Sequence, residues 1–229
     1  MNEVKIEVSQ TFDLNIYALN KETEKREVEY ATKTALQLGK VAMDFARVDR
    51  VPRYDSESRE SDVEHSFMLQ MVAIEFAETH LPGLDSGLIA KFCGVHDLPE
   101  LIVGDVATFD ISKEELLKKS EREAIAMKAL EHTLPPHTYS LLLRYEEQVE
   151  PEARFVRFID KLLPLIVDIH GPGMQVMQED YGVYDKESYY VADNKQKQRC
   201  TELFTDPDFL IVHKVREKLS EQFAATFMS

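Results

Sequence analysis

Four residues of this sequence combine metal-ligand side chains with strongly apolar surroundings. His96 and Asp97 form an adjacent pair after the apolar run 88–93, His65 opens a second apolar segment, and Asp160 lies within a third. Burying charged or imidazole groups is costly unless they have partners. Imidazole beside carboxylate is a donor set that suits a divalent first-row metal ion. The sequence therefore predicts a metal centre formed by His65, His96, Asp97 and Asp160.

Each of these residues also has an ordinary explanation when it is considered alone. A buried histidine is commonly a hydrogen-bonded core residue, and Asp160 could pair with the neighbouring Arg157 or Lys161. The order His, His-Asp, Asp on three separate apolar segments is much more specific than any single member. This order favours a metal centre over four unrelated buried groups.

The elements that must position these residues are predicted to be helices. Ser61 and Glu64 form a capping-box pattern that opens a helix through residue 79, and this helix is apolar almost all round, as expected in the middle of a bundle. Pro99 should end or kink the helix that carries His96 and Asp97, and begin a short new one. Further helices are expected at 28–47, 86–97, 112–132 (with a second capping box at Ser112), 138–148, 152–170 and 208–227.

The remaining segments are predicted to be irregular. Residues 4–8 alternate between apolar and charged and suggest a short strand or an ordered arm, 49–60 suggest a loop, and 178–198 a long loop or short helices. The expected fold class is an all-α helical bundle with a short N-terminal arm and a C-terminal helical extension. The predicted boundaries are an arm at 1–27, a catalytic core at 28–175, and a C-terminal loop and helix at 176–229 that pack on the same domain.

Composition limits the classes of partner. The chain has 229 residues, 44% of them hydrophobic, and a formal net charge of −15, which disfavours nucleic-acid polymers and anionic membranes. Its longest apolar runs are too short to span a bilayer. Cys93 and Cys200 have no CxxC spacing, which favours free thiols and a cytoplasmic location. A small phosphorylated ligand remains compatible with this charge, because a metal and one or two arginines can reverse the local sign.

The motifs together resemble the HD-domain metal-dependent phosphohydrolases, and specifically their 5'-deoxynucleotidase branch. The matching segments are Arg50-Val51-Pro52, Ser61-Asp62-Val63-Glu64-His65-Ser66, His96-Asp97-Leu98-Pro99-Glu100, Gly104-Asp105 and Phe158-Ile159-Asp160-Lys161. The resemblance covers about residues 28–170. It implies an HD-domain helical bundle, a homodimer and one divalent transition metal per chain, such as Mn, Co, Fe, Ni or Zn.

The resemblance also implies roles for three further residues. Glu100 is expected to be the general acid or base, and its simple alternative is a carboxylate favoured by a helix N-terminus. Arg50 is expected to bind the substrate phosphate and to assist catalysis, because a guanidinium can hold two phosphate oxygens. Asp105 is expected to bind a sugar hydroxyl.

Two features leave alternatives open. The 5'-deoxynucleotidase branch usually has an aromatic residue after the arginine, whereas this chain has Val51 and contains no tryptophan. The selectivity for deoxyribose is therefore open, and a tyrosine from 181–190 could compensate. His132 and His137 lie where phosphodiesterases with two metals carry extra histidines, but the surrounding turn-like sequence favours a single metal.

The expected function is removal of the 5'-phosphate from (deoxy)nucleoside 5'-monophosphates. One alternative is hydrolysis of dNTPs to release triphosphate or pyrophosphate. Another is a non-catalytic HD scaffold that binds a nucleotide or a protein.

Overall fold

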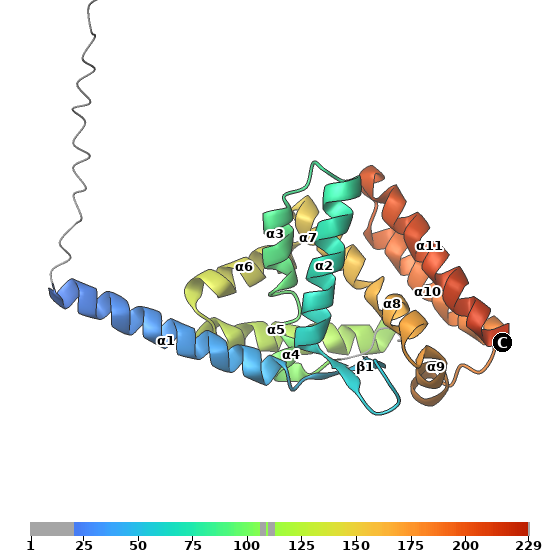
Figure 1. Cartoon of the computed structure of the whole chain (residues 1–229), viewed down its shortest axis with the longest axis horizontal. Coiled ribbons are helices and arrows are strands. Elements are labelled where there is room, and N and C mark those ends of the chain that lie inside the picture. The colour runs from blue at the N-terminus through green and yellow to red at the C-terminus, as the bar shows by residue number, and fades with distance from the viewer. Residues whose placement is uncertain (1–20, 106–108, 110–112, 229) are drawn as a thin grey trace, which may run out of the picture. The chain divides into compact units, whose positions relative to one another are not determined.

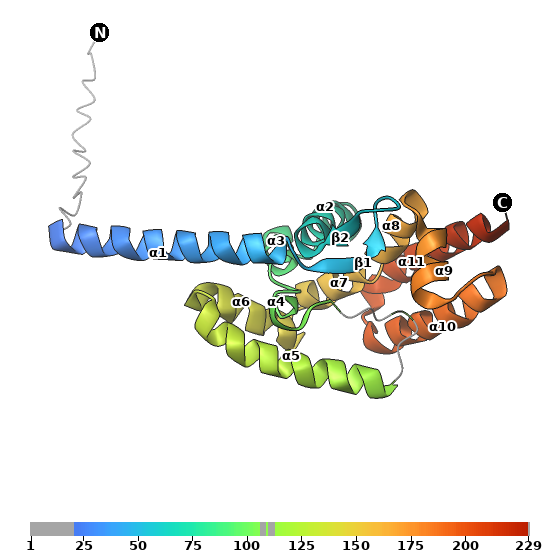
Figure 2. The same ribbon diagram turned by 90° about the horizontal axis from the view of Figure 1, so that it is seen from below.

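The protein is represented by a computed structural model that describes residues 21–105, 109 and 113–228 (Figures 1 and 2). The chain divides into two units, residues 1–36 and 37–229, and every predicted site residue lies in the second. The prediction of an all-α fold is confirmed. None of the helices within the described residues is long and apolar enough to cross a membrane.

The elements follow one another in a simple order. They are α1 (Lys21–Phe45), β1 (Asp49–Arg53), β2 (Arg59–Ser61), α2 (Asp62–His80), α3 (Ser86–Cys93), α4 (Glu100–Val103), α5 (Lys113–Thr133), α6 (Pro136–Glu147), α7 (Pro151–Asp160), α8 (Leu163–His170), α9 (Gly173–Tyr181), α10 (Lys186–Leu203) and α11 (Leu210–Ala224). Short 3₁₀ helices at Pro207–Phe209 and Ala225–Met228 flank α11.

Helix α2 begins as the sequence predicts. The Ser61 side chain accepts a hydrogen bond from the Glu64 N–H, and the Glu64 carboxylate accepts one from the Ser61 N–H. The helix packs on α3 and α7 through a strip that includes Leu69, Ala73 and Ala77. It is not buried all round, however, because Phe67 and Met71 remain 63% and 60% exposed. The prediction of a fully enclosed helix is therefore wrong on this side.

The segment 49–60 is not a loop but contains most of an antiparallel hairpin, in which Asp49 pairs with Ser61 and Arg53 with Arg59. Alternate residues of both strands point inward, so that Arg50 and Glu60 are buried. Pro52 is compatible with this strand, because a strand at the edge of a sheet has N–H groups that need no ladder partner. The hairpin brings two charged side chains to the candidate site.

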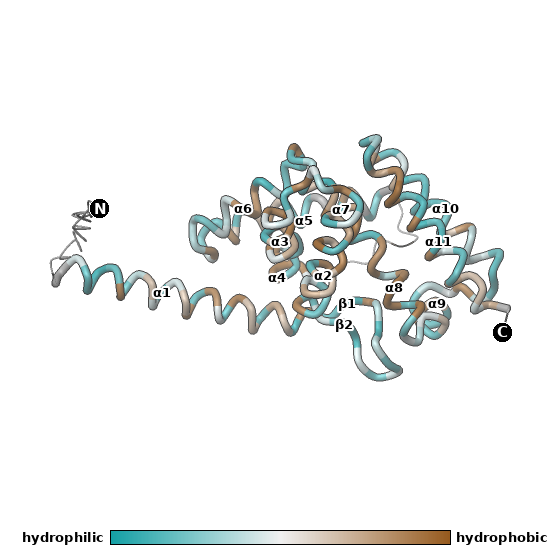
Figure 3. The backbone as a smooth tube through the Cα atoms, turned by 45° about the horizontal axis from the view of Figure 1, so that its top comes forward, coloured by the Kyte–Doolittle hydropathy of each residue, from teal (hydrophilic) through white to brown (hydrophobic). Residues whose placement is uncertain are grey.

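The predicted helix 152–170 is divided into α7 and α8, with a turn at Lys161 and Leu162. Pro164 stands in the first turn of α8 and has no N–H to donate to the carbonyl four residues earlier. The interruption places Asp160 as the last residue of α7. Figure 3 shows long hydrophobic stretches along α7 and α8, where they form part of the core.

Residues 178–198 are mostly helical, as one of the two predicted alternatives allowed, but α10 is an 18-residue helix rather than a short one. Helix α9 ends at Gly182, whose φ of +66° suits glycine, and α10 opens with a capping box of Asp185 and Ser188. Tyr189 is fully buried in a second apolar cluster beside Phe223.

The predicted strand at 4–8 and the predicted cap at Ser112 lie outside the described residues. The domain boundaries at 28 and 176 stay predictions.

A buried polar network joins α10 to α11. The Arg216 guanidinium donates to Asp193 at 2.6 Å, the Ser220 hydroxyl donates to the same carboxylate at 2.6 Å, and the Tyr189 hydroxyl donates to Ser220 at 3.1 Å. Arg216 and Asp193 are both almost fully buried. The ion pair therefore fixes how the two C-terminal helices pack.

We expect Arg216→Met to lower the free energy of unfolding by about 3–5 kcal/mol, because it leaves the buried Asp193 carboxylate without its cation. Urea denaturation followed by circular dichroism measures this change. The control is Lys218→Ala on the same helix. Its exposed side chain pairs with Glu221, and this substitution should change the free energy of unfolding by less than about 0.5 kcal/mol. Equal stability of the two variants would contradict the role of the network.

Candidate metal centre and pocket

The structure brings the four predicted ligands together. One donor atom from each of His65, His96, Asp97 and Asp160 lies within 4.8 Å of the others. His65 comes from the first turn of α2, Asp160 from the last residue of α7, and the His-Asp pair from the turn after α3. Three elements that are distant in the sequence thus place four donors around one point.

His96 has the arrangement of a metal ligand. Its Nδ1 lies 3.0 Å from the Cys93 carbonyl oxygen. Because a carbonyl only accepts, Nδ1 carries the proton and Nε2 has a free lone pair. Nε2 is buried without a hydrogen-bond partner and lies 2.9 Å from an Asp97 oxygen. Two lone pairs that converge in a buried site need a cation between them, which fits a divalent metal ion.

His65 is held by two carboxylates. Its Nε2 lies 2.9 Å from Asp160 Oδ1, and its Nδ1 lies 3.3 Å from Glu60 Oε2. Burial lowers the pKa of His65, but the hydrogen bond to Asp160 and the adjacent Glu60 carboxylate outweigh this effect and raise the pKa to about 9. Sequence reasoning missed Glu60, because it placed this residue in a loop. A carboxylate on the far nitrogen of a ligand imidazole fixes the ring orientation.

The alternative pairing of Asp160 is also present. Its Oδ2 accepts a hydrogen bond from Lys161 Nζ at 2.5 Å, while its Oδ1 faces His65. Arg157 instead pairs with Glu146. The two oxygens of Asp160 thus serve different partners, and the lysine pairing does not exclude a metal.

Arg50 lies at the centre of a group of acidic side chains. Its Nη1 is 2.9 Å from Asp62, 2.8 Å from Asp97 and 3.2 Å from Glu100, and its Nε is 3.4 Å from Glu60. Asp62 is fully buried, and burial raises its pKa to about 6. Asp62 is a second site residue that sequence reasoning missed. The neighbouring Ser61 and Glu64 were assigned to a capping box, and Asp62 between them was given no role of its own. Arg50 offsets this negative charge and lines the pocket.

Glu100 is the first residue of α4 and is buried beside Arg50 and Asp97. Burial, together with the nearby Asp97 charge, raises the pKa of Glu100 well above its ordinary value. A carboxyl group that keeps its proton at neutral pH can donate it to a leaving oxygen. The position after Pro99, at the start of a short new helix, agrees with the sequence prediction.

Comparisons with known proteins identify the family. Residues 46–204 match the model of the HD domain, which is more than half of the chain. The chain belongs to the HD-domain family. It is 33% identical over 125 residues to the 5'-deoxynucleotidase HDDC2 of Bos taurus (50% of this chain and 58% of the relative). The 5'-deoxynucleotidase hdd1 of Schizosaccharomyces pombe is 32% identical over 131 residues (51% and 63%). The chain thus spans about three fifths of these relatives.

The HD-domain fold is also seen in a solved structure. The crystal structure of a predicted metal-dependent phosphohydrolase from Magnetospirillum magnetotacticum superposes with a TM-score of 0.65 at 21% identity. The match covers 90% of this chain and 96% of the other. At this identity the similarity shows the fold alone.

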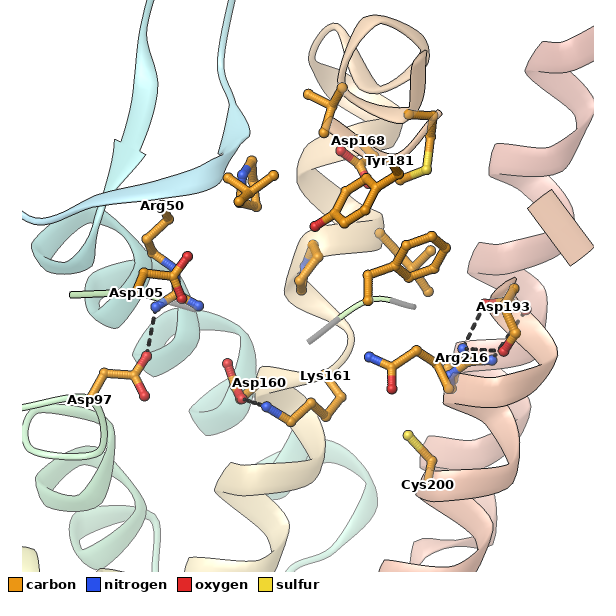
Figure 4. A pocket seen from close by; sticks show the side chains of 18 of the residues that line it. Arg50, Asp97, Asp105, Asp160, Lys161, Asp168, Tyr181, Asp193, Cys200 and Arg216 are labelled. Atoms are coloured by element: carbon orange, nitrogen blue, oxygen red, sulfur yellow. Dashed lines mark hydrogen bonds and ion pairs between the residues drawn. The ribbon is translucent and has the colours of Figure 1, made fainter. Parts of the chain in front are cut away.

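A pocket of about 940 Å³, including its open mouth, extends from the ligand cluster of this HD-domain protein. The side chains around one end are Arg50, Asp97, Glu100, Asp105 and Asp160, and Figure 4 shows four of them around the same space. Asp105 is half-buried there, at the end of the segment that follows α4. Five of the seven predicted site residues thus line this end, and His65 and His96 adjoin it through the ligand cluster.

The other end of the pocket is formed by parts of the chain that the sequence left without a role. We call this the distal half; it is lined by Phe109, Asp168, Val176, Met177, Tyr181, Asp193 and Arg216, among others. Of the tyrosines considered as substitutes for the missing aromatic, Tyr181 lines the pocket, Tyr184 is exposed and Tyr189 is buried in the core.

The two histidines considered for a second metal lie apart from the cluster. His132 and His137 are exposed on α5 and α6. Neither belongs to a group of potential metal ligands within the described residues. These two histidines therefore do not take part in the described ligand cluster.

We expect Asp160→Ala to weaken binding of Mn²⁺ or Co²⁺ by more than about 100-fold, and Glu60→Gln by about 10–100-fold, because the first removes a donor and the second only the support of His65. Competition with a chromogenic chelator measures both affinities. His132→Ala is the control and should bind the metal as the unchanged protein does. A normal affinity in Asp160→Ala would contradict the assigned donor set.

Proposed function

We propose that this HD-domain protein is a metal-dependent 5'-nucleotidase that removes the phosphate from deoxynucleoside 5'-monophosphates. The observation that carries the proposal is the four-donor cluster with Arg50 and Glu100 beside it, at one end of a pocket large enough for a nucleotide. The relatives named 5'-deoxynucleotidase support the choice of substrate.

The proposed mechanism assigns a task to each group. His65, His96, Asp97 and Asp160 hold one divalent transition metal such as Mn, Co, Fe, Ni or Zn. Such an ion lowers the pKa of a bound water toward neutrality and polarises a phosphoryl oxygen. Arg50 Nη1 lies 2.8 Å from the Asp97 ligand, so a phosphate that reaches the metal also lies within reach of the guanidinium. Arg50 then offsets the charge that develops on the phosphate oxygens.

Glu100 is the general acid in this proposal. Its raised pKa keeps the carboxyl protonated in a buried site. As a water oxygen forms a bond to phosphorus and the ester P–O bond breaks, this proton passes to the 5'-oxygen of the leaving nucleoside. Asp105, which lines the same end of the pocket, accepts a hydrogen bond from a sugar hydroxyl. Neither Glu100 nor Asp105 needs to contact the metal for these tasks.

The alternative action on triphosphates is less well supported. A triphosphate needs several cations along its path. The pocket lining offers three basic residues, Arg50, Lys161 and Arg216, and all three already have acidic partners. Lys161 donates to Asp160, and Arg216 donates to Asp193. A monophosphate is therefore the better match for the described charges.

The assembly and location form part of the same proposal. We propose a homodimer that uses the exposed apolar side chains Phe67 and Met71, which lie one turn apart on α2. Light scattering of the purified protein measures the mass.

The buried free thiols Cys93 and Cys200 support a reducing, cytoplasmic environment.

A screen of purified protein loaded with Mn²⁺ or Co²⁺ against deoxynucleoside and ribonucleoside mono- and triphosphates tests the function directly. The expected result is release of inorganic phosphate from deoxynucleoside monophosphates. Release of triphosphate or pyrophosphate from a dNTP would support the alternative enzyme. Hydrolysis of none of these substrates would support a binding scaffold.

Separate alanine substitutions of Glu100 and Asp97 should separate proton transfer from metal binding. Glu100→Ala should lower kcat by about 100-fold or more while the metal remains bound, because general acid catalysis contributes about 10²–10⁴-fold. Asp97→Ala should lose both metal and activity. Metal analysis and phosphate release on the same samples decide between the roles, and unchanged turnover in Glu100→Ala would refute its assignment.

A further inference from the structure

The distal half of the pocket contains a buried acid that the proposed reaction does not use. Asp168 lies on α8, is only 6% exposed and lines the pocket. Its Oδ1 is buried and has no hydrogen-bond partner. A carboxylate oxygen in this position is costly unless a ligand supplies a donor. Burial and the nearby Glu60 charge raise the pKa of Asp168 to about 8, in accordance with this missing donor.

The pocket connects Asp168 with the ligand cluster. Lys161, Pro164, Leu165 and Asp168 all line the pocket and follow one face of α8 and the turn before it. Asp160 lies on the other side of this turn, at the end of α7, and lines the same pocket. A nucleotide with its phosphate at the ligand cluster therefore extends its base along this wall toward Asp168.

Aromatic side chains lie next to this acid. Tyr181 lines the distal half together with Phe109, and their rings pack edge to face with centroids 5.0 Å apart. Figure 4 shows Tyr181 and Asp168 side by side on the same wall. Helix α9 approaches α8 closely because Gly173 has no side chain; a Cβ atom there would overlap the backbone of Asp168. Flat aromatic walls of this kind stack on nucleobases.

The other charged groups at this end already have partners. Asp193 is paired with Arg216 and accepts from Ser220. They form a fixed wall, whereas Asp168 lines the pocket and its buried Oδ1 has no hydrogen-bond partner among the described residues. What this carboxyl group lacks is a hydrogen-bond donor.

We propose that the distal half is the nucleobase subsite and that Asp168 selects guanine, so that dGMP is the preferred substrate. Guanine presents two adjacent donors, the ring N1–H and the exocyclic amino group, which match the two oxygens of one carboxylate. Adenine and cytosine present an amino group beside a ring acceptor, and thymine presents one N–H between two carbonyls. This inference rests on the proposed nucleotidase function and specifies its substrate.

The test compares dGMP with dIMP, which differ only in the exocyclic amino group. The unchanged protein should show a kcat/KM for dGMP at least tenfold higher than for dIMP. Asp168→Asn, which has nearly the same shape but offers one acceptor and one donor, should bring this ratio close to one. Calorimetric titration of both nucleotides into Glu100→Gln, which is expected to bind without turnover, should show the same preference in Kd.

The control is Glu152→Gln, a buried acid on α7 that accepts from the Asp85 N–H at 3.0 Å and does not line the pocket. It should leave the dGMP to dIMP ratio unchanged. A ratio near one in the unchanged protein, or one that Asp168→Asn does not alter, would overturn the base assignment and leave the nucleotidase function intact. Failure to hydrolyse any nucleotide would overturn the function and the inference with it.

Discussion

The structure of this site depends on the cost of concentrating negative charge in a buried space. Glu60, Asp62, Asp97, Glu100 and Asp160 all lie within a few ångströms of Arg50 or His65. Carboxylates at such distances cannot all ionise without cations. Arg50 contacts four of them and Lys161 the fifth, but the lone pairs of His96 and Asp97 still face each other. A divalent ion is the group that resolves this remaining conflict.

The same requirement explains why the helices are interrupted where they are. Helix α3 ends at Cys93, and α7 ends at Asp160 before the turn that precedes Pro164. Each interruption places ligands at a helix end, where side chains from different elements converge. The hairpin then adds Arg50 and Glu60 from outside the bundle. A pair of continuous helices would carry the same residues, but their side chains would be distributed over two faces.

The C-terminal helices complete the pocket rather than only covering the core. The Asp193–Arg216 pair holds α10 against α11, and Gly173 allows α9 to approach α8. These contacts bring Tyr181 and Asp168 to the end of the cavity opposite the ligand cluster. The pocket therefore combines a charged end, where several acids surround Arg50 and Lys161, with an aromatic end that contains an unpaired acid.

The sequence by itself was sufficient for the residues whose type and local spacing carry the information. The four ligands, Glu100 and the capping box at Ser61 depend on short motifs, and the all-α class follows from apolar periodicity. Glu60, Asp62 and Asp168 were not recognised, because an isolated acid in a sequence looks the same whether it is solvated or buried. The hairpin at 49–61 and the full length of α10 were missed for a related reason: long-range packing outweighs weak local preference. Only tertiary contacts between segments far apart in the chain decide the place of each acid. They decide which acids belong to the ligand cluster, which contact those ligands, and which line the pocket without a partner.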